Sequence, residues 1–325
     1  MIYNKWYIVM ESKEVKRGGL AGAVRFNERL LFWRKNSGEL VCFYDKCAHR
    51  GASLSIGKHF GDEVACPFHG FRYDSNGKTT LIPANGRASA VPDNFKMKTY
   101  PVIEKFGFIF MWWGEVREEY PEIKYFENID DSFSFCTTKH IWNVQYSRAI
   151  ENQLDLVHLP FVHKTTIGAG NKTLVNGPVE LVKEGEIEFR VFNEIDKGQK
   201  AKNEKELQGV EEEKQHIHFI FPNMWQNWIV QKMRILVAFV PVDEEHTCIY
   251  LRTAQKFVKF PILKELTDAI MMYFSIIVLN QDKRVVLTQI PKYSELKMNE
   301  NLVSGDKPIA TYRMLRDRMK NTKKQ

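Results

Sequence analysis

The chain has 325 residues, of which 44% are hydrophobic and 13% aromatic, so it can bury one large core or two ordinary ones, and a two-domain protein is expected. Its net charge of +7 arises from 47 basic residues scattered among 40 acidic ones, which is not the continuous basic stripe of a nucleic-acid-binding protein. We therefore expect no nucleic-acid partner and interpret the charge as a source of solubility or as a docking face for an acidic protein.

The sequence predicts neither a signal peptide nor a membrane-spanning segment. No basic and then apolar leader precedes the first strand-like run, KWYIVM, which predicts that there is no signal peptide. The longest apolar stretch, residues 269–279, is too short to span a bilayer and predicts a buried helix. Five widely spaced cysteines, an odd number, favour a reducing compartment. The prediction is a cytoplasmic protein without a membrane span.

Residues 1–115 are predicted to form an all-β domain. Strand-like runs flank turn signals three times: LLFWRK and LVCFYD around NSGE, FRYD and KTTLI around SNG, and MKTYPVIE and FIFMWW around KFG. No amphipathic helix of four turns stands out before residue 140. Three β-hairpins are therefore expected in this region.

Residues 116–325 are predicted to form an α+β domain, which makes the fold class α+β overall. After an acidic, proline-containing junction at 113–131, helical periodicity appears at 147–158 and 261–288. Strand-like runs lie between them: EIEFRVF, HIHFIF and RILVAFVPV. Residues 193–215 are dense in Lys, Glu, Gln and Asn, which is typical of a solvated loop. We expect an antiparallel sheet with helices.

Two short motifs in the first region combine one cysteine with one histidine each. They are Cys47-Ala-His49 and Cys66-Pro-Phe-His69, with sixteen residues between the pairs. Structural zinc sites favour Cys-x2–4-Cys pairs joined to a second such pair or to His-x3–5-His. The mixed pairs suit a [2Fe-2S] cluster in which two thiolates hold one iron and two imidazoles hold the other. The alternative is a zinc knuckle or a redox-silent pair of loops.

The sequences CAHRG and CPFHGFRYDSNG resemble the cluster motif of Rieske-type non-haem iron oxygenases. The resemblance implies that Cys47 and Cys66 hold one iron, and that His49 and His69 hold the other. Four glycines would let the two loops fold closely over the cluster, namely Gly51, Gly57, Gly61 and Gly70. Phe68 and Phe71 stand where the family often has Tyr and Trp, and the hydroxyl missing at residue 68 would remove a hydrogen bond near the cluster.

A second motif, ENQLDLVHLPFVH at residues 151–163, lies in the second region. On a helix, Asp155 and His158 would share one face, and Pro160 would bend the chain so that His163 turns back toward the same point. Imidazoles beside carboxylates suit Fe(II). The alternative is a helix-terminal acid and two core histidines.

The spacing Asn152-x2-Asp155-x2-His158-x4-His163 resembles the catalytic-iron motif of the same family. The family's third ligand is an aspartate on a late helix, and LNQDKRVV places Asp282 there. The resemblance implies a triad of His158, His163 and Asp282 around a mononuclear Fe(II), with open positions that admit oxygen. It implies that Asp155 links His158 to a cluster histidine, His69, of a neighbouring subunit, and that Asn152 lies close to the ligands.

The resemblance is to the branch that includes vanillate and dicamba demethylases and saxitoxin-pathway hydroxylases. It implies the oxygenase component of a multicomponent monooxygenase that uses O2 to hydroxylate or oxidatively demethylate a small organic molecule. It also implies a head-to-tail homotrimer. No dinucleotide fingerprint is visible, so electrons from NAD(P)H are expected through a separate reductase or ferredoxin. The alternatives are an aromatic ring dihydroxylating dioxygenase and a Rieske electron-transfer protein without oxygenase activity.

Other candidate residues carry weaker signals. His59 is predicted to be a surface histidine and not a ligand. His216 and His218 alternate with apolar residues, so they lie on one face of a strand, either as a pocket wall or as a packed or solvated face. Trp225 and Trp228 could line a cavity or pack in a core. The isolated cysteines are predicted to be buried as small apolar residues: Cys42, Cys136 and Cys248.

Overall fold

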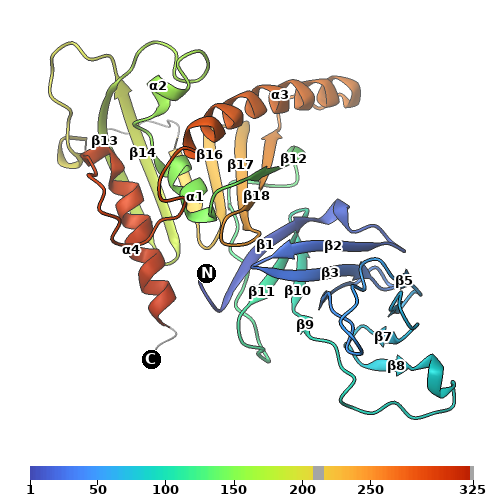
Figure 1. Cartoon of the computed structure of the whole chain (residues 1–325). Coiled ribbons are helices and arrows are strands. Elements are labelled where there is room, and N and C mark those ends of the chain that lie inside the picture. Colours follow the sequence, from blue (N-terminus) through green and yellow to red (C-terminus); the bar gives the residue numbers. More distant parts are fainter. Residues whose placement is uncertain (208–215, 323–325) are drawn as a thin grey trace. The chain divides into compact units, whose positions relative to one another are not determined.

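The computed structural model describes residues 1–207 and 216–322, and it divides into two compact units (Figure 1). One unit is Asn4–Tyr120, and the other starts at Pro121 and includes Met1–Tyr3. The expected boundary after residue 115 lies between β11 (Phe108–Trp113) and β12 (Ser134–Trp142), where one unit gives way to the other. In the described part of the chain, no helix has the length and apolar character needed to cross a bilayer.

The N-terminal unit is built from three small antiparallel sheets, with strand orders β1-β11-β10, β2-β3-β4-β9 and β5-β6-β7-β8. All three predicted hairpins are confirmed, as β3–β4, β7–β8 and β10–β11. The remaining bounds are β1 (Lys5–Glu11), η1 (Ser12–Glu14), β2 (Leu20–Arg25), β3 (Glu28–Arg34), β4 (Leu40–Tyr44), β5 (Lys58–His59), β6 (Glu63–Ala65), β7 (Arg72–Asp74), β8 (Thr79–Leu81), η2 (Pro83–Asn85), β9 (Thr99–Tyr100) and β10 (Val102–Lys105).

The second unit is one antiparallel sheet of seven strands in the order β12-β18-β17-β16-β15-β14-β13. Its strands are β12, β13 (Leu174–Lys183), β14 (Glu186–Glu194), β15 (His216–Ile220), β16 (Met224–Val230), β17 (Met233–Pro241) and β18 (Thr247–Gln255). Its helices are α1 (Tyr146–Leu154), α2 (Leu159–Val162), η3 (Glu204–Leu207), α3 (Pro261–Val286), η4 (Ser304–Asp306) and α4 (Lys307–Asn321). The predicted fold class, an all-β unit followed by a helix-covered antiparallel sheet, is confirmed.

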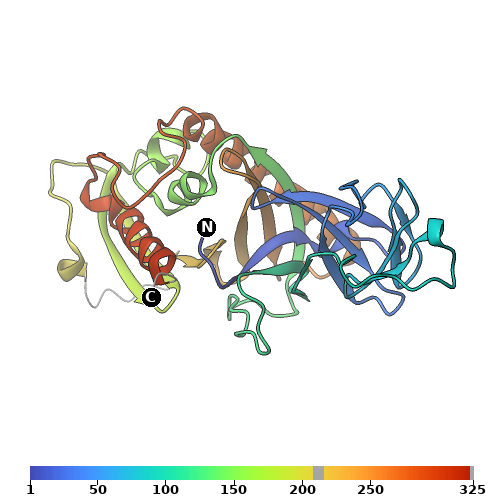
Figure 2. The same cartoon turned by 60° about the horizontal axis from the view of Figure 1, so that its bottom comes forward.

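The core of this unit lies between one face of the sheet and three helices. Neighbouring strands place Phe219, Trp225, Val237 and Leu251 side by side in register. These residues are buried together with apolar side chains of α1, α3 and α4. Helix α3 packs against β12 and β18, α1 against β17, and α4 against β13 and β14. The helices therefore cover the same face, as the second view also shows (Figure 2).

The predicted buried helix at residues 269–279 forms the middle of α3, but the prediction of its burial is wrong. Ile270, Tyr273 and Phe274 are 49%, 64% and 60% exposed. A helix that packs against a sheet on one side only buries the narrow stripe that faces the strands. In α3 that stripe consists of Asp268, Met272, Leu279, Asp282 and Val286.

Two smaller expectations concern the polar segment and the isolated cysteines. Within the predicted loop at 193–215, η3 ends at Leu207, and residues 208–215 lie outside the described residues. Cys42 and Cys248 are buried as predicted, whereas Cys136 is only partly buried on the edge strand β12. All five cysteines have free thiols.

Candidate cluster and metal centres

The loop that carries Cys47 follows β4 and is held in shape by one buried carboxylate. Asp45 accepts hydrogen bonds from the backbone N–H groups of Leu54 (2.5 Å) and Ser55 (2.9 Å) and from the Ser55 hydroxyl (2.6 Å). The Cys47 N–H donates to the carbonyl of Ala52 at 2.8 Å. These bonds close the loop back on itself and fix the direction of the thiol.

The loop that carries Cys66 follows β6 and closes in a similar way. The Cys66 N–H donates to the carbonyl of Phe71 at 2.8 Å, and the Gly70 N–H donates to the carbonyl of Cys66 at 3.0 Å. Gly51 and Gly70, one in each loop, have φ of +76° and +71°, a left-handed conformation that side chains other than glycine strain to adopt. Both loops therefore need glycine to turn over their cysteine.

The thiols of the two loops are buried, and the imidazoles are exposed. Cys47 and Cys66 are each 3% exposed, whereas His49 and His69 lie at the surface with their Nδ1 atoms 3.2 Å apart. The Tyr73 hydroxyl lies 3.0 Å from Cys47 Sγ. Burial raises the pKa of the Cys66 thiol, against the opposing effect of two backbone N–H groups that face its sulfur. Donors around sulfur are what a thiolate ligand requires.

The zinc and cluster hypotheses differ in how closely the four ligand atoms of these loops must gather. In a tetrahedral zinc site, bonds of 2.0–2.3 Å would bring all ligand atoms within about 4 Å of one another. Among the described residues, only the set His158, His163 and Asp282 brings three or more possible ligand atoms within 4.8 Å of one another. No three of the four loop side chains therefore gather at one point, which fits a cluster with a separate iron for each pair better than a single zinc ion.

In the second unit, the chain turns sharply between the end of α1 and α2. Asp155 leaves the helix with an extended backbone (φ −86°, ψ 126°), and its Oδ1 accepts the N–H of Val157 at 2.7 Å. His158 directly precedes α2 and His163 directly follows it. The predicted helix through residue 158, with Asp155 and His158 on one face, is thus wrong. The Asp155 side chain competes for backbone N–H groups and ends the helix early.

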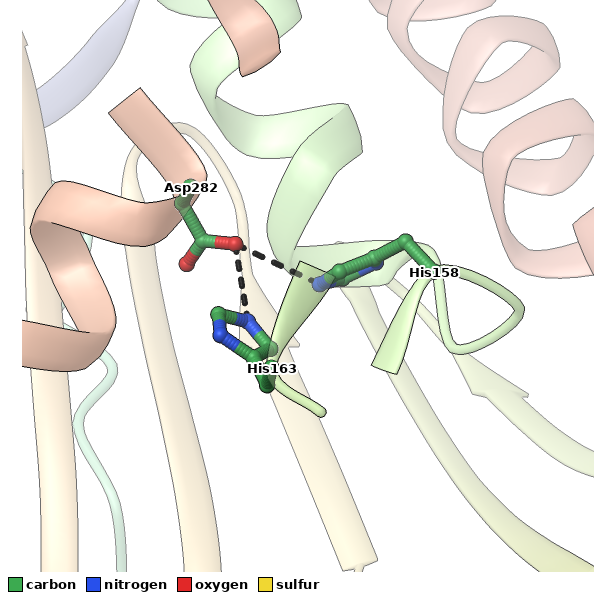
Figure 3. Close-up of side chains that lie close together, drawn as sticks. All are labelled: His158, His163 and Asp282. Atoms are coloured by element: carbon green, nitrogen blue, oxygen red, sulfur yellow. Dashed lines mark ion pairs between the residues drawn. The ribbon is translucent and has the colours of Figure 1, made fainter. Parts of the chain in front are cut away.

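Three side chains converge at this turn, and they are the set that the family resemblance implied: His158, His163 and Asp282 (Figure 3). One carboxylate oxygen, Asp282 Oδ1 on α3, lies 3.3 Å from His158 Nε2 and 2.9 Å from His163 Nε2. His163 and Asp282 are 1% and 3% exposed. Two imidazole nitrogens and a carboxylate oxygen that point at one another form the donor set that Fe(II) takes in a 2-His-1-carboxylate site.

The charges of this site favour a cation. Burial alone would lower the pKa of His158, but the neighbouring carboxylates of Asp155 and Asp282 raise it to about 9. Burial alone would raise the pKa of Asp282, yet His158 and His163 hold it well below its usual range. A divalent ion bound here would take the place of the proton on His158.

Sequence reasoning missed two glutamines that contact the metal triad, by which we mean His158, His163 and Asp282. Gln153 Nε2 donates to Asp282 Oδ2 at 3.0 Å, and Gln281 Oε1 lies 2.8 Å from His163 Nδ1. Both residues were visible beside the motifs, but glutamine is too common on helices to be a signal by itself.

The two residues predicted to support the ligands differ in their contacts. Asp155 Oδ2 lies 3.4 Å from His158 Nδ1, beyond a normal hydrogen bond, and its side chain is 27% exposed. Asn152 sits on α1, where its buried Nδ2 finds no hydrogen-bond partner among the described residues. The Nδ2 of Asn152 therefore makes no hydrogen bond to the metal triad.

The two tryptophans of β16, Trp225 and Trp228, lie on opposite faces of the sheet. Trp225 packs in the core and donates its Nε1–H to the carbonyl of Gln153 at 3.0 Å. Trp228 lies on the other face, in register with His216 and with the Arg234 guanidinium 3.5 Å over its ring. Of the two alternatives, cavity lining or core packing, Trp225 follows the packing one. The two tryptophans do not line one cavity together, because an odd separation in a strand places them on opposite faces.

The histidines outside the two motifs have ordinary partners. His218 lies on the same face as His216, with Nε2 3.0 Å from Glu186 Oε2, so neither belongs to the metal triad's face. His59 is partly buried, not a surface residue as predicted, because its Nε2 lies 2.8 Å from the carbonyl oxygen of Arg34.

The chain matches two family profiles. The Rieske [2Fe-2S] domain matches residues 5–101, and the Vanillate O-demethylase oxygenase C-terminal domain matches residues 142–322, more than half of the chain. A Toluene-4-sulfonate monooxygenase system iron-sulfur subunit, TsaM1 of Comamonas testosteroni, is 29% identical over 55% of this chain and 51% of its own length. The Vanillate O-demethylase oxygenase subunit of Pseudomonas sp. (strain HR199 / DSM 7063) is 29% identical over 56% of this chain and 50% of its own length.

Solved structures share the fold over the whole chain. Dicamba monooxygenase bound to dicamba superimposes with a TM-score of 0.81 at 18% identity, over 100% of this chain and 99% of that chain. Pseudomonas putida CBB5 NdmA gives a TM-score of 0.78 at 23% identity, over 99% and 92%. These similarities concern the fold alone.

The matched segments fit the two centres described above. The chain spans about half the length of the curated relatives it matches. The Rieske domain and the oxygenase relatives imply a Rieske [2Fe-2S] cluster and a mononuclear non-haem iron as cofactors. Both donor sets found here, the thiol and imidazole pairs and the metal triad, suit these groups chemically. The chain belongs to the family of the vanillate O-demethylase oxygenase C-terminal domain, within the Rieske-type non-haem iron oxygenases.

Proposed function

We propose that this protein is the oxygenase component of a multicomponent Rieske monooxygenase, which uses O2 and externally supplied electrons to hydroxylate or oxidatively demethylate a small organic molecule. The observation that carries the proposal is the convergence of His158, His163 and Asp282 in a chain that also holds two Cys-His loops. An electron carrier has no use for a second, buried donor set.

In this proposal, the two Cys-His loops bind the [2Fe-2S] cluster, and the metal triad binds the mononuclear iron. Cys47 and Cys66 hold one iron of the cluster through their buried thiolates, and His49 and His69 hold the other through Nδ1. His158, His163 and Asp282 hold the mononuclear ferrous ion. When bound, the cluster supplies single electrons, and the ferrous ion supplies the O2-activating chemistry through coordination positions that the protein leaves open.

The chain's own contribution is geometry and exclusion of water. His163 and Asp282 are almost fully buried, and the indole of Trp225 ties the end of α1 to the sheet beneath them. A dry enclosure strengthens the electrostatic interactions within the site and suppresses side reactions with water.

Electron supply in this proposal requires other chains. The exposed His49 and His69, beside the 59% exposed Phe68, offer a contact surface at the cluster. We propose a reductase or ferredoxin that passes electrons from NAD(P)H to this surface.

We also propose a head-to-tail homotrimer in which the partly exposed Asp155 carboxylate bridges His158 to His69 of a neighbouring subunit. The exposed apolar residues of α3 are consistent with an assembly that covers them. None of the five cysteines forms a disulfide, which supports a reducing compartment, for which we propose the cytoplasm.

The first test is metal and sulfide analysis of anaerobically prepared protein, together with electron paramagnetic resonance after dithionite reduction. The proposal expects three irons and two sulfides per chain and a Rieske-type signal. Two irons would favour the electron-transfer protein, and zinc in place of iron would refute the cluster assignment.

A matched pair of variants then tests the oxygenase activity. His163→Ala is expected to lose one iron and all product formation while it keeps the cluster signal. The control is His246→Ala, because His246 pairs with Asp243 at the surface and lies outside the metal triad. Turnover is measured with a reductase on a panel of vanillate, dicamba and caffeine. Product from His163→Ala at the rate of the control would contradict the proposal.

A further inference from the structure

Gln281, the residue before Asp282 on α3, makes a set of hydrogen bonds around the buried histidine of the metal triad. Its Oε1 lies 2.8 Å from His163 Nδ1 and accepts the Thr166 hydroxyl at 2.9 Å. Its Nε2 donates to the Thr165 hydroxyl oxygen at 3.3 Å. The two threonine hydroxyls flank the amide, and in the structure its oxygen faces the imidazole.

That orientation selects one form of His163. An amide oxygen only accepts, so the hydrogen bond requires a proton on His163 Nδ1. The other ring nitrogen, Nε2, lies 2.9 Å from Asp282 Oδ1, on the side where the donor atoms converge. A neutral imidazole with its proton on Nδ1 has its lone pair on Nε2, the atom that must bind the metal.

We propose that Gln281 is a positioning residue for the metal triad: its amide oxygen fixes the tautomer and the ring direction of His163 so that Nε2 is free for the ion. This inference rests on the proposed function, because it requires a metal ion at the triad. Residues 281 and 282 are consecutive on α3, so one helix end supplies both a ligand and the group that orients another ligand. A small shift of α3 therefore moves both together.

The two histidines of the triad have different partners, and the difference has a chemical consequence. His158 faces the carboxylate of Asp155, whereas His163 faces the neutral amide of Gln281. A carboxylate acceptor makes a ligating imidazole more basic than an amide does. Gln281→Glu is therefore expected to keep the metal and to stabilise the ferric state relative to wild type.

The test is anaerobic titration of protein stripped of its mononuclear iron, with ferrous ion as the probe and the cluster left in place. Removal of a partner that orients a ligand typically weakens metal binding 10–100-fold, and Gln281→Leu is expected to fall in that range. The matched control is Gln289→Leu, an exposed glutamine beyond the end of α3, which is expected to keep the wild-type Kd.

A second measurement reports the proton itself. In protein loaded with Co(II), each ligating imidazole gives a hyperfine-shifted N–H resonance that disappears in D2O. Loss or accelerated exchange of one such resonance in Gln281→Leu, with its return in Gln281→Glu, would support a positioning role that a general loosening of the fold would not produce.

The outcomes separate this inference from the proposed function. If wild type binds no ferrous ion at the triad, the proposed function fails and this inference with it. If wild type binds and Gln281→Leu shows the same Kd and the same N–H resonances, only the positioning role is refuted. Should Gln281→Leu fail to fold, Thr166→Val removes one donor that holds the amide, and an unchanged Kd in that variant would overturn the inference.

Discussion

Gly57 lies between the two cluster loops, at a point where the backbone comes too close for a side chain. A Cβ on residue 57 would lie 2.2 Å from the carbonyl oxygen of Ala65 and 2.9 Å from that of Leu54. Neither atom can rotate away, because both belong to the backbone. Overpacking of this kind costs about 1–3 kcal/mol, and we expect Gly57→Ala at the upper end of that range. Ala65 precedes Cys66, so the displacement also moves a proposed cluster ligand.

For a domain of about 100 residues, a loss of about 3 kcal/mol lowers the apparent Tm by roughly 12–24 °C. The assay is thermal unfolding at a fixed scan rate, with cluster content followed by visible absorption. The control is Gly19→Ala, where the added Cβ would meet its nearest atom at an ordinary 3.4 Å. That variant is expected to be unchanged or slightly stabilised by the stiffer unfolded chain. If Gly57→Ala keeps both the wild-type Tm and full cluster content, the argument from close backbone approach is wrong.

Three further perturbations test the catalytic unit. Asp282→Asn is expected to bind ferrous ion at least tenfold more weakly with an unchanged cluster signal, and wild-type iron content would contradict this. Burial raises the pKa of Glu300, but Arg148 and Arg313 hold it below its usual 4.5. The stability that Glu300 contributes is thus present above about pH 4.5 and lost in acid, so the Tm difference between wild type and Glu300→Gln should shrink from pH 7 to about pH 3. Glu151→Ala removes the buried partner that Arg148 and Arg313 share and leaves them only the partly exposed Glu300. Chemical denaturation is expected to show a loss of about 3–5 kcal/mol, whereas a loss under 1 kcal/mol would count against the buried pair.

The features that local sequence could predict are those set by short spacing. The Cys-His pairs and the three N-terminal hairpins depend on residues within a few positions of each other, and the turn residues carry strong conformational preferences. The late aspartate was placed by family resemblance instead, since nothing near Asp282 indicates that His163, 119 residues earlier, lies beside it. The prediction of a helix through residue 158 was wrong. From the sequence, Asp155 could lie within the helix or end it, and only the structure shows that its side chain bonds the backbone and ends it.

Helix α4 shows why some elements escaped prediction. Its segment, KPIATYRMLRDRMKN, spaces Ile309, Tyr312 and Leu315 at helical intervals, but charged residues between them obscure the apolar stripe. Arg313 is buried all the same, because it meets Glu151 of α1 at 2.7 Å, 162 positions away in the chain. A charged residue such as Arg313 is expected at the surface when only its sequence neighbours are considered, because the distant partner that allows its burial is not among them.

That ion pair also bears on the metal triad. Glu151 ties α1 to α4 at one end, and two residues later the carbonyl of Gln153 accepts the indole N–H of Trp225 from the sheet. The side chain of the same Gln153 donates to Asp282 on α3. The last turn of α1 is thus bonded to α4, to the sheet and to Asp282. Directly after it, the chain turns at Asp155 and leads to His158. Because a metal site tolerates only small errors in ligand position, such convergent anchoring is what allows ligands from two distant segments to meet at one point.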